Sequence, residues 1–188
     1  MLHLPTLHRR IQLCSVVSQA ADISGLASES RLPIVLTLGA DLSEDQKSQI
    51  LQFFGIDQSE VTTITITNAD EKEKLGNLIS AEKIGSYTYS CALVNPTNAG
   101  GIQVKTANLN YVTSNTIASQ LSTSGVYNCE VLTAAPFEVS GTGALTGVMM
   151  AYEEASGAQL DEGKKELANV ELITTGNIAD TVGQDQAT

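Results

Sequence analysis

Residues 134–156 of the chain read AAPFEVSGTGALTGVMMAYEEAS, and this stretch decides the fold. Pro136 has no amide hydrogen and restricts the residue before it, so we expect a strand to end near Ala134. From Leu145 onward the apolar residues recur with the i, i+3, i+4, i+7 spacing of one helix face. Gly157 follows, at the position where a left-handed residue often ends a helix. The stretch therefore predicts a strand, a glycine-rich turn and an amphipathic helix.

The turn at residues 140–143 has two interpretations. In the first it is a ligand site, because exposed backbone amides at a helix N-terminus suit a phosphate or a carboxylate. In the second it is an ordinary tight turn, and the small residues Ala144, Gly147 and Ala151 let another backbone approach the helix closely. The glycine spacing matches neither the dinucleotide fingerprint nor the P-loop, so we favour the second interpretation. The candidate ligand-binding residues are Ser140, Gly141, Thr142 and Gly143.

The composition describes a globular chain without a nucleic-acid or membrane signature. Its 188 residues, 42% of them hydrophobic, suffice for one domain with its own core, which the low aromatic content of 4% makes aliphatic. The formal net charge of -11 argues against nucleic acid or an anionic membrane as a partner. No run approaches the roughly 18 apolar residues of a membrane span. We expect residues 31–182 to form a single α/β domain, followed by a polar tail at 183–188.

The N-terminal segment, residues 1–30, has two interpretations as well. Arg9 and Arg10 precede a short apolar run from Ile11 to Val17, and residues 18–20 resemble a small-x-small cleavage site. These features are those of an export signal, but the apolar run is short for one. We therefore favour a disordered or mis-started N-terminus over a weak signal.

The reactive residue types exclude several chemistries. Both histidines, His3 and His8, lie in the N-terminal segment, so the body of the chain lacks the histidine of Ser-His-Asp and Cys-His systems and of many metal sites. The cysteines form no CxxC pair and no zinc spacing. We expect no catalytic residue, no metal and no cofactor. Cys91 and Cys129 fall in predicted strands, either as buried thiols, which we favour, or as one disulfide of an exported protein.

The first half of the chain predicts a strand, a helix and a second strand. Residues 34–38 form a continuous apolar run, and residues 61–67 are rich in β-branched side chains. A helix with a capping box starting at Ser43 joins them, which implies a right-handed parallel crossover. Asn68 then caps a second helix, and we interpret the charged run at 71–74 as its solvated face, with local ion pairs.

The second half predicts the rest of the sheet. Residues 86–94 and 102–112 both alternate, and the loop between them, rich in Asn and Gly, predicts an antiparallel hairpin. A helix after Thr113 leads to the last strand at 126–134, which makes a second crossover. We therefore expect a mixed α/β fold with about five strands in one mixed sheet, helices packed on it, and an extra C-terminal helix at 160–173.

Several of these stretches carry a resemblance to a known family. Residues 36–43 read LTLGADLS, residues 54–56 read FGI, residues 83–85 read KIG, and residues 134–147 contain the turn described above. Collinear over residues 33–182, they resemble the YpuA-like proteins, the domain-of-unknown-function family numbered one thousand and two. The resemblance implies a protein of Gram-positive bacteria, extracellular or in the cell envelope, with no established activity. The weak signal in this chain leaves a cytoplasmic location as the alternative. The resemblance carries over no functional residues. Such proteins are typically longer, which suggests that this chain is a fragment, a variant or a trimmed gene model.

Three functions fit these observations. We favour a non-enzymatic exported or envelope-associated binding or structural domain, whose partner is an unknown protein or polymer. The second is a hydrolase, a transferase or an anion-binding protein that uses the 140–143 turn or paired carboxylates, and the third binds divalent cations. The carboxylates near element ends are Asp41, Asp57, Asp70 and Glu138. The oligomeric state stays open.

Overall fold

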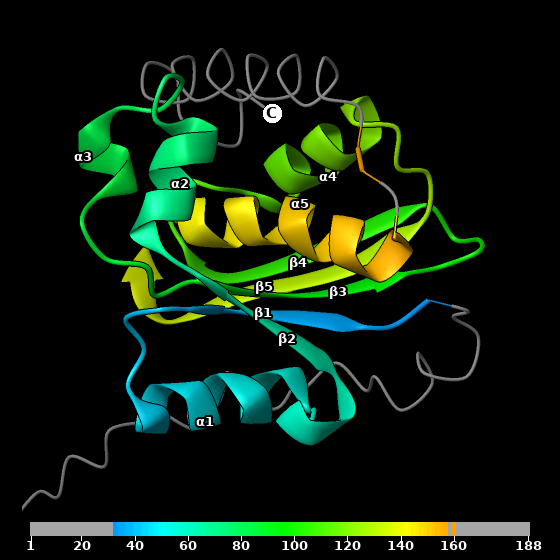
Figure 1. Ribbon diagram of the computed structural model, residues 1–188, viewed down its shortest axis with the longest axis horizontal. Helices are drawn as coiled ribbons and strands as arrows, with labels where there is room; N and C mark the ends of the chain where they lie inside the picture. The colour runs from blue at the N-terminus through cyan, green and yellow to red at the C-terminus, as the bar shows by residue number, and fades with distance from the viewer. Residues whose placement is uncertain (1–31, 158, 161–188) are drawn as a thin grey trace, which may run out of the picture.

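The computed structural model describes residues 32–157 and 159–160, which form three layers around one sheet (Figure 1). The strands are β1 (Val35–Gly39), β2 (Thr62–Ile66), β3 (Cys91–Pro96), β4 (Ile102–Leu109) and β5 (Cys129–Val139). The helices are α1 (Glu44–Phe54), α2 (Asn68–Leu75), α3 (Ala81–Ile84), α4 (Ser114–Thr123) and α5 (Thr142–Ser156), with a 3-10 turn, η3, at Gln58–Glu60. The predicted N-terminal segment, C-terminal helix and polar tail lie outside the described residues. The mixed α/β class is confirmed.

The sheet has the strand order β2-β1-β3-β5-β4. β3 is antiparallel to both of its neighbours, whereas β1 and β2 are parallel, as are β4 and β5. The five-stranded mixed sheet and the two crossovers, β1-α1-β2 and β4-α4-β5, are therefore confirmed. Both crossovers step in the same direction along the sheet, but α1 and α4 pack on opposite faces. They consequently have opposite hands, and only one follows the usual right-handed rule.

The predicted hairpin between residues 86–94 and 102–112 is wrong. β3 and β4 do run in opposite directions, but β5 lies between them and pairs with both. The connection at 97–101 can cross two strand spacings, roughly 10 Å, because five extended residues reach about 17 Å. The carbonyl of Gly101 accepts the Cys129 amide at 3.1 Å, so this connection holds the start of β5. Alternation along the chain identified the strands but not their partners.

β5 also runs further than expected, through Pro136 to Val139. Its pairing with β3 ends at Ala134, so the missing amide of the proline removes no bond on that side. On the other side β4 bulges at Asn108, which adopts a φ of 59° and donates from Nδ2 to the carbonyl of Ala135 at 2.8 Å. The bulge therefore carries the β4–β5 pair past the proline.

α5 lies against the middle of the sheet and forms the centre of the core on that face (Figure 1). Its small residues allow the close approach that the sequence predicted. A Cβ added at Gly147 would lie 2.5 Å from Thr37 Oγ1 on β1. Ala144 and Ala151 on the same helix are fully buried. The opposite face of the sheet is covered by α1, through Ile50 and Phe54.

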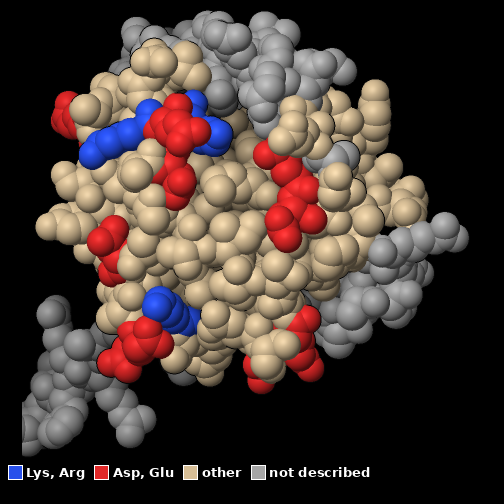
Figure 2. Space-filling view, in the orientation of Figure 1, with Lys and Arg blue, Asp and Glu red and all other residues tan. Residues whose placement is uncertain are grey.

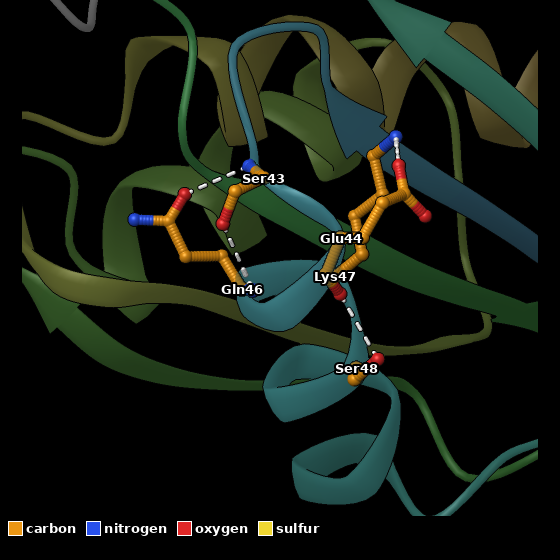
Figure 3. A network of polar contacts seen from close by, with 5 residues as sticks. All are labelled: Ser43, Glu44, Gln46, Lys47 and Ser48. Atoms are coloured by element: carbon orange, nitrogen blue, oxygen red, sulfur yellow. Dashed lines mark hydrogen bonds and ion pairs between the residues drawn. The ribbon is translucent and has the colours of Figure 1, made fainter.

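α1 begins with the predicted capping box (Figure 3). The Gln46 amide donates to Ser43 Oγ at 3.3 Å, and the Ser43 amide donates to Gln46 Oε1 at 2.9 Å. Lys47 forms an ion pair with Glu44 at 2.7 Å on the exposed side of the same turn. Gly55 ends the helix with a φ of 69°, a left-handed conformation that favours glycine.

Candidate functional site

The chain gathers its polar turns at one edge of the sheet. β1, β2, β4 and β5 all end at this edge, and β3 begins there. We call it the carboxyl edge. In open α/β sheets this is the edge at which ligands bind. Four segments meet there: Asp41 after β1, α2 after β2, residues 87–90 before β3, and the 140–143 turn after β5.

α2 supplies a buried carboxylate that the sequence did not reveal. Its N-cap is Thr67, not Asn68, and its capping box uses Asp70, whose Oδ2 accepts the Thr67 amide at 2.8 Å. The next residue, Glu71, therefore plays no part in capping and points inward, with only 1% of its surface exposed. The interpretation of 71–74 as a solvated face is wrong for Glu71 and holds for the rest of the run, where Lys74 pairs with Glu73 at 3.0 Å.

Hydroxyl groups surround the Glu71 carboxylate. Thr88 Oγ1 donates a hydrogen bond to Glu71 Oε1. Oε2 has no partner in hydrogen-bond geometry among the described residues. The Thr142 hydroxyl lies nearby and also contacts Ser140 Oγ at 3.2 Å. Burial raises the pKa of Glu71, and the negative charge of Asp41 raises it further. The hydroxyls of Thr142 and Thr88 oppose this rise in pKa because they favour the charged form.

The first turn of α5 packs directly onto this carboxylate. Gly141 precedes the helix with a φ of 92° and provides no side-chain cap. Instead Ser90 Oγ accepts the Ala144 amide at 2.7 Å. A Cβ added at Gly143 would lie 2.6 Å from Thr88 Cγ2 and 3.0 Å from Ser90 Oγ, so the contact leaves no room for a methyl group. We call Glu71, Thr88, Ser90, Thr142 and Gly143 the polar cluster.

The polar cluster shows where the candidate ligand-binding residues lie. Gly141, Thr142 and Gly143 are buried, and Ser140 is half-buried. A helix N-terminus favours a negative charge, and here the neighbouring carboxylate belongs to the protein itself. Glu71 Oε1 would lie 3.3 Å from a Cβ at Gly143. Binding of an external anion at the turn stays a prediction.

The other carboxylates near element ends serve local structure. Asp57 Oδ1 accepts the Ser59 amide at 2.9 Å, which caps η3 and lowers the pKa of Asp57. Glu138 Oε1 accepts from Asn110 Nδ2 at 3.1 Å. Among the described residues, no three His, Cys, Asp or Glu side chains come together in a way that could hold a metal ion.

The two cysteines named as a candidate disulfide are both free thiols. Cys91 lies beside Ala134 and Cys129 lies beside Pro96, so they occupy opposite ends of the β3–β5 pair. Five residues of strand separate them by roughly 16 Å, which is far beyond disulfide reach. Burial raises the pKa of Cys91 to about 11 and that of Cys129 to about 12, with a contribution from Glu130 for the latter. Both thiols therefore stay protonated near neutral pH.

The carboxyl edge also carries three aromatic rings, which we call the aromatic ladder: Tyr87, Tyr89 and Phe137. The ring centroids of Tyr87 and Tyr89 lie 6.0 Å apart, and those of Tyr89 and Phe137 lie 5.0 Å apart. Tyr87 is 65% exposed and Phe137 is 43% exposed, whereas Tyr89 packs on the α1 side of the core. The ladder was not predicted from the sequence, because both tyrosines were expected in a strand and Phe137 beyond one. One signal in the sequence could have indicated the ladder: these three residues are three of only eight aromatic residues in the chain, and all three flank the carboxyl edge.

The fold and these features define a mixed α/β protein with a closed polar cluster and an open aromatic surface at one sheet edge. A family model described as "Protein of unknown function (DUF1002)" matches residues 38–188. The chain belongs to this family, as the resemblance predicted. It is 41% identical over 155 residues to "Uncharacterized protein YpuA" of Bacillus subtilis (strain 168), which covers 82% of this chain and 53% of that protein. The chain thus spans about half the length of this relative, and no solved structure matches it.

Proposed function

We propose that the chain is a non-enzymatic binding domain of the cell envelope or exterior, and that the aromatic ladder is its binding surface. The observation that carries this proposal is the exposure of Tyr87 and Phe137, each in tilted ring contact with Tyr89, at the carboxyl edge. The location is the one that the resemblance to YpuA-like proteins implies. The described residues contain no helix with the length and apolarity to cross a membrane.

The ladder has the properties of a contact surface. Large aromatic side chains dominate the energetics of interfaces, and grouped exposed rings are unusual on a surface that binds nothing. Tyr89 is anchored in the core and contacts both outer rings, so their positions are restrained before any partner arrives. Restrained side chains lose little conformational entropy on binding, which favours affinity.

The competing function is hydrolysis or anion binding at the 140–143 turn. The polar groups of that turn contact one another and their neighbours: Ser140 with Thr142, and Ser90 with the Ala144 amide. These contacts support a packing role for the turn, which leaves the ladder as the better candidate for function.

Co-sedimentation with isolated Bacillus subtilis cell envelopes tests the proposal. We expect the chain to sediment with the envelopes, and the double variant Tyr87→Ala, Phe137→Ala to stay in the supernatant. Tyr127→Ala is the matched control, because Tyr127 is 81% exposed and contacts none of the ladder rings. Equal sedimentation of the ladder variant and the control would overturn the proposal. So would turnover in a panel of ester, phosphate and glycoside substrates that Ser140→Ala abolishes.

A further inference from the structure

We infer that the partner of the aromatic ladder is a basic peptide segment, whose Lys or Arg side chains lie on the exposed rings beside Asp41. This inference rests on the proposed function and adds the chemistry of the partner. Three features support it: a carboxylate fixed beside the backbone that carries the rings, the acidic groups that follow it in the chain, and the exposed ring of Tyr87.

Asp41 is held beside the ladder by two hydrogen bonds to one residue. The Thr88 amide donates to Asp41 Oδ2 at 2.7 Å, and the Asp41 amide donates to the Thr88 carbonyl at 3.1 Å. Thr88 lies between Tyr87 and Tyr89 in the chain, so its partner carboxylate is fixed beside the backbone that carries both rings. The side chain of Asp41 is itself exposed. A cation at this position would contact a ring and a carboxylate together, which is more favourable than either contact alone.

The charge around the ladder is negative. Asp41 is followed by Glu44 and Asp45 in the first turn of α1, both exposed, and Lys47 in the same helix is bound to Glu44. Lys83, four residues before Tyr87, lies over the Tyr111 ring. On the face shown in Figure 2, the Lys and Arg atoms lie against Asp or Glu atoms, whereas other acidic groups stand apart from any basic atoms. With a net charge of -11, the chain attracts basic segments and repels acidic polymers.

The ring of Tyr87 has the exposure that a cation contact needs. Two thirds of this residue faces solvent, and its contact with Tyr89 is tilted, with 35° between the ring planes. The protein uses the same chemistry internally, since Lys83 Nζ lies 4.6 Å from the centroid of the Tyr111 ring. The aliphatic parts of Arg and Lys side chains also pack against aromatic rings, and the ladder provides several rings in a row for this contact.

Fluorescence anisotropy with a labelled peptide of alternating Lys, Arg and Gly residues tests this inference. A lysine-acetylated, arginine-free copy, a Glu-Gly copy and a neutral chitin oligosaccharide serve as comparison probes. We expect binding of the basic peptide alone, weakened about threefold to tenfold by Tyr87→Leu, which keeps an apolar side chain but removes the ring. Asp41→Asn should weaken binding similarly, whereas Tyr127→Ala and Glu154→Gln, at exposed positions off the ladder, should not.

Each outcome decides between the inference and the proposed function. If the basic peptide binds equally well to all four variants, the attraction is unspecific charge and the inference is overturned. If the chain sediments with envelopes through the ladder but binds only the oligosaccharide, the partner is a neutral glycan and the proposed function survives without the inference. If neither probe binds and the ladder variant sediments normally, both are wrong. Circular-dichroism melts of each variant show that the comparison is made on folded protein.

Discussion

The polar cluster and the aromatic ladder are built from one short segment, residues 87–90, and have opposite characters. Thr88 and Ser90 point toward α5 and are buried, whereas Tyr87 is exposed and Tyr89 packs on the α1 side. The extended backbone alternates its side chains between the two sides of the sheet edge. It therefore buries both polar residues and leaves the ring of Tyr87 in solvent, the reverse of the usual distribution.

This reversal separates two roles that a sheet edge often combines. The hydroxyls of Thr88 and Ser90 bind Glu71 of α2 and the Ala144 amide of α5, so these groups are committed within the protein. The ladder leaves apolar area in water, which contributes nothing to folding and is available to a partner. Stability should therefore depend strongly on the cluster and weakly on the ladder, and binding should show the opposite dependence.

The largest expected effect comes from Gly143→Ala. Its new methyl group would lie 2.6 Å from Thr88 Cγ2, so the first turn of α5 must shift away from residues 88–90. We expect the free energy of unfolding to fall by about 3 kcal/mol, measured by urea denaturation. Gly157→Ala is the control: its φ of 64° makes alanine strained, but nothing lies within 4 Å, so it should cost only about 1 kcal/mol. Equal effects of the two substitutions would show that the turn is not closely packed.

Thr88→Val should have the next largest effect. Valine keeps the shape of threonine but cannot donate to Glu71 Oε1, which leaves a buried carboxylate oxygen without its partner. We expect a loss of roughly 2 kcal/mol in the free energy of unfolding, the usual result of leaving one buried polar group unsatisfied. Thr65→Val, at an exposed position of β2, is the matched control. A Thr88→Val protein as stable as this control would mean that Glu71 has another donor.

The contrast between cluster and ladder also shows what the sequence could predict. Periodicity located the helices and the small-residue face of α5, because those features depend on residues close in the chain. The burial of Glu71 was not predicted, because the sequence favoured Asn68 as the N-cap of α2. The N-cap is Thr67, one residue earlier, so Asp70 completes the capping box and Glu71 faces α5. The pairing of β3 with β5, in place of the expected pairing with β4, was missed for a similar reason: strand partners are chosen by contacts between distant segments.

The candidate site divides in the same way. The 140–143 turn was identified from its glycines, and packing was the favoured role, but the groups it packs on come from residues 71 and 88–90 and are far away in sequence. The ladder joins Tyr89 to Phe137, which lies on β5 beyond Pro136. We expected the strand to end before this proline. Local patterns could therefore indicate where a site begins, but not which distant side chains complete it.

Glu71→Gln should change how stability depends on pH. Because the folded-state pKa of Glu71 is raised, mainly by burial, the folded protein holds this proton more tightly than the unfolded chain. Its contribution is fully present below the ordinary pKa of 4.5 and is lost as the pH rises through the folded pKa. We expect the variant, which has no charge to bury, to gain stability relative to the natural chain across this window, with a constant difference above it. Urea midpoints measured from pH 4 to pH 8 show this difference, and parallel curves would contradict it.

The smallest effect on stability is expected at the ladder. Tyr87→Ala removes an exposed ring whose only described ring contact is with Tyr89, so the free energy of unfolding should change by no more than about 0.5 kcal/mol. Combined with Phe137→Ala, the same change should abolish co-sedimentation with envelopes. Gly143→Ala should behave in the opposite way at temperatures where it stays folded, with normal sedimentation and low stability. If Tyr87→Ala destabilises the protein as much as Thr88→Val does, the ladder is part of the core and the division of this edge into a packed side and a binding side fails.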